Sequence, residues 1–169
     1  MSYLVRKISN PAKWGEKPYL AGNEISADAL TTDLRTTEGR LSFWNTENSA
    51  RDYFKDIALA IAATWQRIDR MNIVFIDKKL IEQKGISFED TAGITPLEDF
   101  KKYHCEAIHL DVQRIVKVAQ CVAQAIRIGN QQYLFTTSEI VEILREGISK
   151  KRINIDDLMP DLQSALKEK

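Results

Sequence analysis

One residue cluster in this chain has a spacing that suits metal chemistry, His104-Cys105-x-x-x-His109. On a helix, Cys105 and His109 would lie four residues apart on one face, as two zinc ligands can. A structural zinc site needs four ligands, and the spacing supplies no others. A reactive thiolate needs an electropositive setting, which the neighbouring Glu106 disfavours. We therefore expect a surface histidine beside a half-buried thiol, and no metal site.

A second group mixes carboxylates with a guanidinium near a predicted turn and consists of Asp28, Asp33, Arg35 and Glu38. In an extended strand Asp33 and Arg35 point to the same side. With Arg6 or Lys7 from the first predicted strand, they could line a polar cleft for a phosphate or a carboxylate. Ion pairs on a solvated sheet face are the commoner arrangement. The candidate ligand-binding residues are Arg6, Asp33, Arg35 and Glu38.

Two tryptophans, Trp14 and Trp44, lie outside the strongly periodic segments of the sequence. A large amphipathic ring that is not fully buried often anchors a protein partner. Trp65 instead continues an apolar helical stripe and is expected in the core. We therefore predict an exposed apolar patch of several hundred Å² that contains Trp14 or Trp44.

A basic run, Lys150-Lys151-Arg152, ends a predicted helix that begins with Glu139 and Glu142. Acidic residues at the start of a helix and basic residues at its end complement the helix dipole without a ligand. The next predicted helix opens with Asp156-Asp157, which is unsuited to contact with phosphates. No nucleic-acid partner is expected.

Several well-defined enzyme motifs are absent from the sequence. It contains no G-x-G-x-x-G, G-x-x-x-x-G-K-[ST], H-E-x-x-H or G-x-S-x-G. Dinucleotide, P-loop, zincin and α/β-hydrolase chemistries therefore lack their sequence support. No cofactor is expected, and the sequence favours a role other than catalysis.

The composition is that of an ordinary globular protein, with 44% apolar and 28% charged residues. Its 24 basic and 24 acidic residues cancel, which excludes strong global attraction to nucleic acid or an anionic membrane. Two cysteines are too few for a disulfide framework and suit a reducing compartment. Neither a secretory signal nor an apolar stretch long enough for a membrane is visible. The expected location is cytoplasmic.

The first half of the chain predicts strands and one central helix. Residues 3–8 read as a short strand, and 32–36 with 40–46 read as a hairpin around Glu38-Gly39. Apolar residues from 53 to 65 follow helical spacing and predict a helix over 49–66. The β-branched run 71–76 predicts a covered strand, which would complete a right-handed βαβ unit.

The second half predicts mostly helices. A short helix is expected over 78–84, and the turn-rich residues 86–96 mark the one candidate sub-boundary. Helices then follow at 97–108 and 110–128, the second with a long apolar stripe. A strand is expected at 132–135. A helix that begins at Thr137, opened by a capping box at Thr136 and ended by the basic run 150–152, and a last helix over 155–166 complete the chain.

These patterns predict one α+β domain over 1–169. A small mixed sheet of about three to five short strands would pack against two buried central helices, with a helical C-terminal half. The favoured function is a non-catalytic protein-interaction module that binds a partner protein or its own copy. The alternative is a small enzyme or a nucleotide- or anion-binding domain, for phosphoryl or glycosyl transfer, that uses polar residues at the sheet edge.

Overall fold

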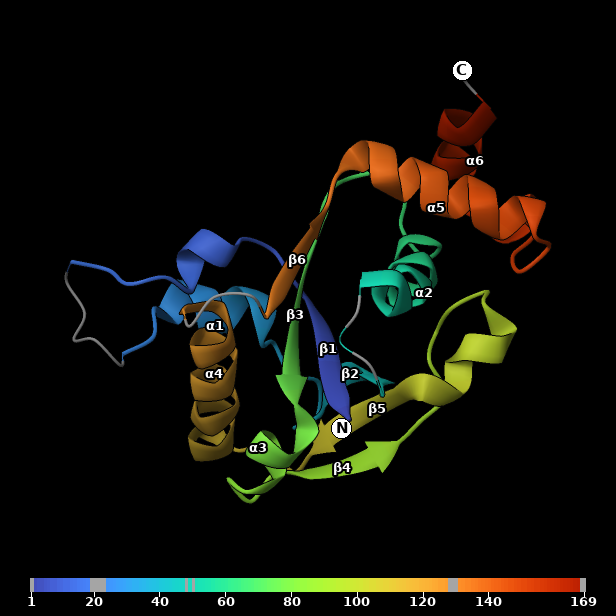
Figure 1. Ribbon diagram of the computed structural model, residues 1–169. Helices are drawn as coiled ribbons and strands as arrows, with labels where there is room; N and C mark the ends of the chain where they lie inside the picture. Colours follow the sequence, from blue (N-terminus) through green and yellow to red (C-terminus); the bar gives the residue numbers. More distant parts are fainter. Residues whose placement is uncertain (1, 19–23, 48, 50, 128–130, 168–169) are drawn as a thin grey trace.

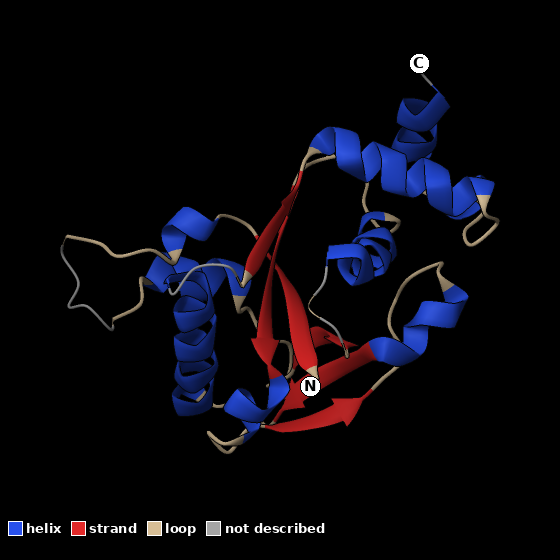
Figure 2. Cartoon of the chain, in the orientation of Figure 1, coloured by secondary structure: helices blue, strands red, loops and turns tan. Residues whose placement is uncertain are grey.

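The computed structural model describes residues 2–18, 24–47, 49, 51–127 and 131–167, and its centre is a six-stranded sheet (Figures 1 and 2). The strand order is β4-β5-β2-β1-β3-β6, and every neighbouring pair is antiparallel. The strands are β1 (Tyr3–Ile8), β2 (Leu41–Thr46), β3 (Met71–Asp77), β4 (Ser87–Asp90), β5 (His104–Ile108) and β6 (Gln132–Phe135).

Apolar side chains cover both faces of the central strands. Leu4 and Val5 are fully buried in two different hydrophobic clusters, as successive residues of a strand must be when both faces are covered. Ile73 and Val74 divide in the same way. Burial on both faces explains why β3 reads as a continuous apolar run rather than an alternating one.

Helices lie on both sides of this sheet (Figure 1). On one side are α1 (Ala27–Asp33), α3 (Lys78–Glu82) and α4 (Val112–Arg127), near the single turn η1 (Pro11–Lys13). On the other side are α2 (Arg51–Ala62), α5 (Thr137–Ser149) and α6 (Pro160–Lys167), with the 3₁₀ helix η2 (Glu98–Tyr103). A further 3₁₀ turn, η3 (Ile155–Asp157), precedes α6.

Helices α2 and α5 approach each other closely at Gly147. A side chain there would place its Cβ 2.9 Å from both terminal methyl groups of Leu59, which is closer than real contacts allow. Glycine therefore lets α5 pack directly on α2, despite its poor helix propensity.

The α+β class is confirmed, and the two long apolar helices predicted over 49–66 and 110–128 are present in shorter form. They are α2 and α4, and they lie on opposite faces of the sheet. The sheet has more strands than the sequence indicated and is antiparallel rather than mixed. Residues 86–96, the candidate sub-boundary, contain strand β4. Strands that precede and strands that follow this range belong to the same sheet.

The predicted hairpin is wrong, because residues 27–33 form helix α1. The side-chain oxygen of Ser26 accepts a hydrogen bond from the backbone N–H of Asp28, which starts this helix. Strand β2 pairs with β1 and β5 instead. Only a single bridge, between Thr37 and Arg40, remains of the expected hairpin turn.

The predicted βαβ unit is modified. Strands β2 and β3 are both antiparallel to β1 and so run in the same direction, with α2 connecting them. However, β1 lies between them, because it pairs with both. The N-terminal strand is thus central in the sheet.

The helix predicted at 97–108 is replaced by η2 and strand β5. Burial in β5 alternates, with Cys105 and Ala107 inside and their neighbours partly exposed. This period of two favours a strand, and the sequence carries it in alternating polar and apolar residues. Among the described residues, no helix is long and apolar enough to cross a membrane.

Helix α5 begins with the predicted capping box. The Thr136 side chain accepts a hydrogen bond from the Glu139 backbone N–H, and the Glu139 carboxylate accepts one from the Thr136 backbone N–H. We expect Thr136→Ala to lower the free energy of unfolding by about 1 kcal/mol. Urea unfolding measures it. The exposed neighbour Thr137→Ala is the control, and an equal loss in both variants would contradict a specific capping role.

Candidate functional site

Arg6, one of the predicted ligand-binding residues, bonds to backbone carbonyls. Its Nε and one terminal nitrogen donate to the carbonyl oxygen of Asp33 at 2.8 and 2.6 Å, and its other terminal nitrogen donates to that of Ser42 at 2.6 Å. It thereby satisfies the C-terminal end of α1, where carbonyls lack partners within the helix. Burial lowers the pKa of Arg6 to about 10, and the charge of Asp33 opposes this shift.

The Asp33 carboxylate is buried and serves the same local structure. One oxygen accepts a hydrogen bond from the indole N–H of Trp14 at 2.8 Å, and the other accepts one from the backbone N–H of Ser9 at 2.7 Å. Charge-assisted bonds of this kind are strong inside a protein. Asp33 therefore joins the loop after β1 to the end of α1.

The four predicted ligand-binding residues do not converge in one pocket. Arg6 and Asp33 line a hollow of about 410 Å³, together with Lys7, Ser9, Thr32, Asp69 and Arg70. Arg35 and Glu38 are exposed and lie outside this lining. The prediction placed Asp33 and Arg35 on one side of a strand over 32–36. Asp33 instead ends helix α1 and Arg35 follows it, so the two side chains are not aligned.

The expectation that Trp14 or Trp44 forms an exposed patch is wrong. Trp14 is fully buried, and Trp44 is 8% exposed. The ring of Trp44 packs against Phe100, with 5.5 Å between ring centroids. Trp65 follows the end of α2 and is partly buried, with Lys7 Nζ 4.5 Å from its ring centroid.

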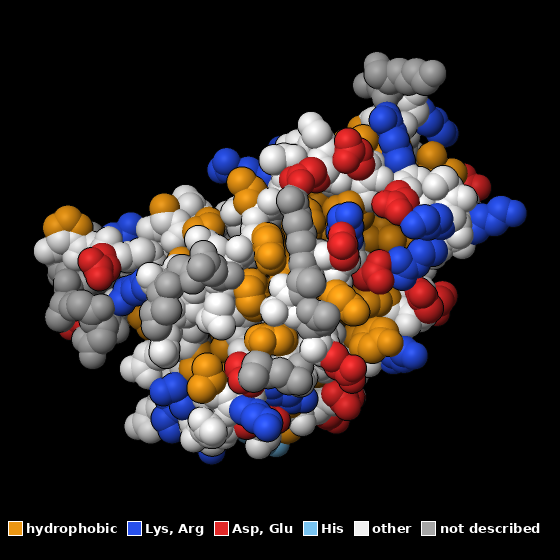
Figure 3. All heavy atoms as spheres, viewed as in Figure 1, with side chains coloured by type: hydrophobic (Ala, Val, Ile, Leu, Met, Phe, Trp, Pro, Cys, Tyr) orange, Lys and Arg blue, Asp and Glu red, His pale blue; other side chains and the backbone are white. Residues whose placement is uncertain are grey.

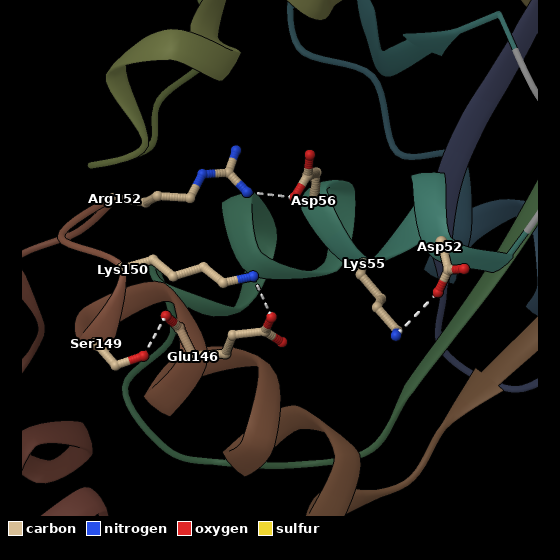
Figure 4. A network of polar contacts seen from close by, with 7 residues as sticks. All are labelled: Asp52, Lys55, Asp56, Glu146, Ser149, Lys150 and Arg152. Carbon is tan, nitrogen blue, oxygen red and sulfur yellow. Dashed lines mark hydrogen bonds and ion pairs between the residues drawn. The ribbon is translucent and has the colours of Figure 1, made fainter.

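Arg152 connects three elements on the α2 side of the sheet. One terminal nitrogen contacts the Asp56 carboxylate of α2, and the other lies 3.3 Å from the Asp99 carboxylate of η2. Figure 4 shows Arg152, just beyond α5, pointing to Asp56. Lys150 pairs with Glu146 within the same region. Lys150 and Arg152 of the basic run thus form ion pairs. The sequence had predicted for this run only a favourable interaction with the helix dipole.

Next to Arg152 lies a hollow of about 530 Å³, which we call the tyrosine groove. Its walls come from the end of β2, the first turns of α2, and η2. Tyr53 and Tyr103 are 54% and 41% exposed, and Phe100 packs beneath Tyr103 with 4.9 Å between ring centroids. The lining includes Asn45, Thr46, Tyr53, Phe100, Lys102 and Tyr103.

Two further hollows lie between α2 and α5. One shares Asp56 and Arg152 with the tyrosine groove, and the other adjoins that first hollow through Asp52 and Glu146. Figure 3 shows acidic, basic and hydrophobic side chains gathered on this face. Acidic residues outnumber basic ones along the three hollows. They are Glu47, Asp52, Asp56, Asp99, Glu139, Glu142 and Glu146, against Lys55, Lys102, Lys150 and Arg152.

A separate hollow of about 400 Å³ lies at the C-terminal end of α2, and we call it the His104 pocket. Trp44 and His104, a register pair of β2 and β5, form one wall. Nδ1 of His104 lies 2.8 Å from the hydroxyl oxygen of Thr91. Burial lowers the pKa of His104, while Glu106 and Thr91 oppose the shift, so the ring is neutral at pH 7.

The residues of the His104-Cys105-x-x-x-His109 cluster do not share a helix face. Cys105 is buried in strand β5, and His109 follows the strand with a φ of 56°. Burial raises the pKa of the Cys105 thiol to about 11, which disfavours the thiolate that binds metals. Within the described parts of the chain, no group of three His, Cys, Asp or Glu residues could hold a metal ion.

Comparison of the chain with protein-family models, curated proteins and solved structures gives no match. Geometry is therefore the basis for assigning a site. Sequence reasoning missed Tyr53 and Tyr103 as surface residues and His104 as a strand residue. The alternation from 104 to 108 was the signal for His104, whereas the exposure of both tyrosines depends on how α2 and η2 pack.

We expect Asp33→Ala to lower the free energy of unfolding by about 3 kcal/mol. The variant leaves the Trp14 indole N–H and the Ser9 backbone N–H without their acceptors. Thermal and urea unfolding measure the loss. Asp157→Ala, at an exposed position in η3, is the control. A loss no larger than that of the control would show that the buried carboxylate is dispensable.

We also expect His104 to reduce stability in mild acid. The unfolded chain takes up a proton at this histidine as the pH falls through 6.5, while the folded chain resists it, so stability declines below that pH. His104→Gln should lose less stability than the original chain between pH 7 and pH 5. Urea unfolding at both pH values measures the difference, and equal losses would contradict it.

Proposed function

We propose that this chain is a non-catalytic protein-interaction module that binds a basic segment of a partner protein in the tyrosine groove. The observation that carries the proposal is a pair of half-exposed tyrosines, Tyr53 of α2 and Tyr103 of η2, that line one hollow of about 530 Å³. The hollow lies along a face on which acidic residues predominate. The buried free thiols support a reducing compartment, so we propose a cytoplasmic location.

The aromatic residues supply binding energy and rigidity. Tyrosine offers a large contact area at low entropic cost and is common among the residues that dominate interfaces. The Tyr103 ring is supported by Phe100, which itself packs on Trp44 in the core. A partner that covers Tyr103 would therefore meet a surface that is already ordered, which reduces the cost of binding.

The charges favour a basic partner over an acidic one. Asp56 and Asp99 are paired with Arg152, but the surplus of carboxylates around the hollows remains. Such a field attracts Lys and Arg side chains and repels acidic ones. Tyrosine faces add cation–π attraction, as Lys102 already shows with its Nζ 5.2 Å from the Tyr103 ring centroid.

A selection from a random-peptide display library against the immobilised chain tests the proposal. We expect the selected peptides to be rich in Lys and Arg. Their affinity, measured by fluorescence polarisation, should fall at least about tenfold in Tyr53→Ser and in Tyr103→Ser, since each loses an aromatic anchor. Higher salt should also weaken binding, because charges contribute to it.

Leu134→Ser is the matched control, since Leu134 is an exposed apolar residue of β6 and lies outside the groove lining. Selected peptides without a basic bias, or peptides whose affinity is equal in all variants, would refute the proposal. Light scattering of the chain alone separates binding of another protein from the self-association that the sequence also allows.

A further inference from the structure

Paired residues of the neighbouring strands β2 and β5 form the floor of the His104 pocket, near the C-terminal end of α2. Trp44 lies opposite His104, and Ser42 lies opposite Glu106, on the sheet face that α2 covers. Residues opposite each other in an antiparallel pair place their side chains on the same face. Helix α2 ends at Ala62, and Ala60, Ile61 and Thr64 line the hollow at that end.

A loop held against β5 forms the rim of this pocket. The Thr91 backbone N–H donates to the His104 carbonyl, and the Gly93 backbone N–H donates to the Lys101 carbonyl. A Cβ on Gly93 would lie 2.5 Å from the Trp44 ring, so only glycine lets the loop approach so closely. Ile94, the next residue, is 91% exposed and also lines the pocket. The loop thus contributes an exposed apolar side chain to the pocket lining.

The pocket holds hydrogen-bonding groups beside apolar walls. The indole N–H of Trp44 has no hydrogen-bond acceptor among the residues that the structure describes, whereas that of Trp14 donates to Asp33. The Trp44 nitrogen is not one of the buried unpaired polar atoms in the described residues, so solvent or a bound molecule can reach it. One nitrogen of His104 bonds with Thr91, and the second ring nitrogen can still donate or accept a hydrogen bond.

The charges in and beside the pocket disfavour an anionic ligand. Glu106 is its charged lining residue, since the His104 ring is neutral. Arg40 pairs with Glu106 at 2.7 Å and also with Glu89, so the cation is already shared between two carboxylates. A phosphate or carboxylate would meet Glu106 without an unpaired cation to offset it.

We propose that the His104 pocket binds an uncharged small molecule, a nucleoside or a monosaccharide in size and chemistry, through the indole N–H of Trp44 and the imidazole of His104. A volume of about 400 Å³ is at the small end of the range for ligand sites. Ring hydroxyls and carbonyls accept from the indole N–H, and the ligand's carbon framework contacts Ile61 and Ile94. This site is distinct from the tyrosine groove, and the proposal does not depend on the groove's function.

Ligand-observed NMR and calorimetry with the full chain test this inference. The probes are the four common ribonucleosides, glucose, galactose and mannose, each beside its 5′- or 6-phosphate. We expect at least one uncharged probe to bind and its phosphate to bind at least about tenfold more weakly. Nucleoside binding and sugar binding distinguish the two chemistries, and either outcome supports the proposal.

Variants locate the binding. Trp44→Phe retains an aromatic ring but removes the indole N–H, and we expect it to weaken binding by about three- to tenfold. Thr64→Phe introduces a large side chain at an exposed lining position and should abolish binding without disturbing the core. Trp65→Phe lies outside the pocket lining and should leave affinity unchanged.

Circular dichroism confirms that each variant is folded. If Trp44→Phe fails to fold, Thr64→Phe decides alone. The inference is overturned if the folded original chain binds no uncharged probe at millimolar concentration, if a phosphorylated form binds more tightly than its parent, or if folded Thr64→Phe binds as well as the original chain.

Discussion

Burial of helix α2 against the sheet is the interaction on which both candidate sites depend. Phe54, Ile57 and Ala58 are fully buried, and they hold the helix across one face of the strands. The apolar area removed from water makes this packing strongly favourable. Hollows lie at both ends of α2. The tyrosine groove lies at the N-terminal end and the His104 pocket at the C-terminal end.

The two hollows share a rigid wall. Trp44 lines the His104 pocket, Phe100 lines the tyrosine groove, and the two rings pack against each other. Arg152 fixes the outer side by pairing with α2 and η2. Tyr103 packs on Phe100, Phe100 packs on Trp44, and Trp44 packs on His104. Because protein interiors are close-packed, this chain of ring contacts fixes the positions of both Tyr103 and His104.

Arg6 and Asp33, two of the residues that the sequence suggested for ligand binding, make hydrogen bonds within the local structure. Arg6 and Asp33 do meet, but the guanidinium bonds to backbone carbonyls and the carboxylate receives a buried indole N–H. Burying either charge without partners would be costly, and the local hydrogen bonds remove that cost. A charged pair drawn together in a fold is thus not by itself a ligand site, and the groups with spare hydrogen-bonding capacity, such as Trp44 and His104, lie elsewhere.

The sequence by itself determined the α+β class, the two long apolar helices, the covered strand β3 and the capping box of α5, because each is encoded by local periodicity or by residues within one turn. Only the tertiary structure decided that β1 lies between β2 and β3, that residues 104–108 form a strand, and that Trp44 is buried while Tyr53 and Tyr103 are exposed. These depend on pairings between residues distant in sequence, such as Val5 with Trp44 and Trp44 with His104. The spacing of residues within one segment does not encode which other segment will cover it.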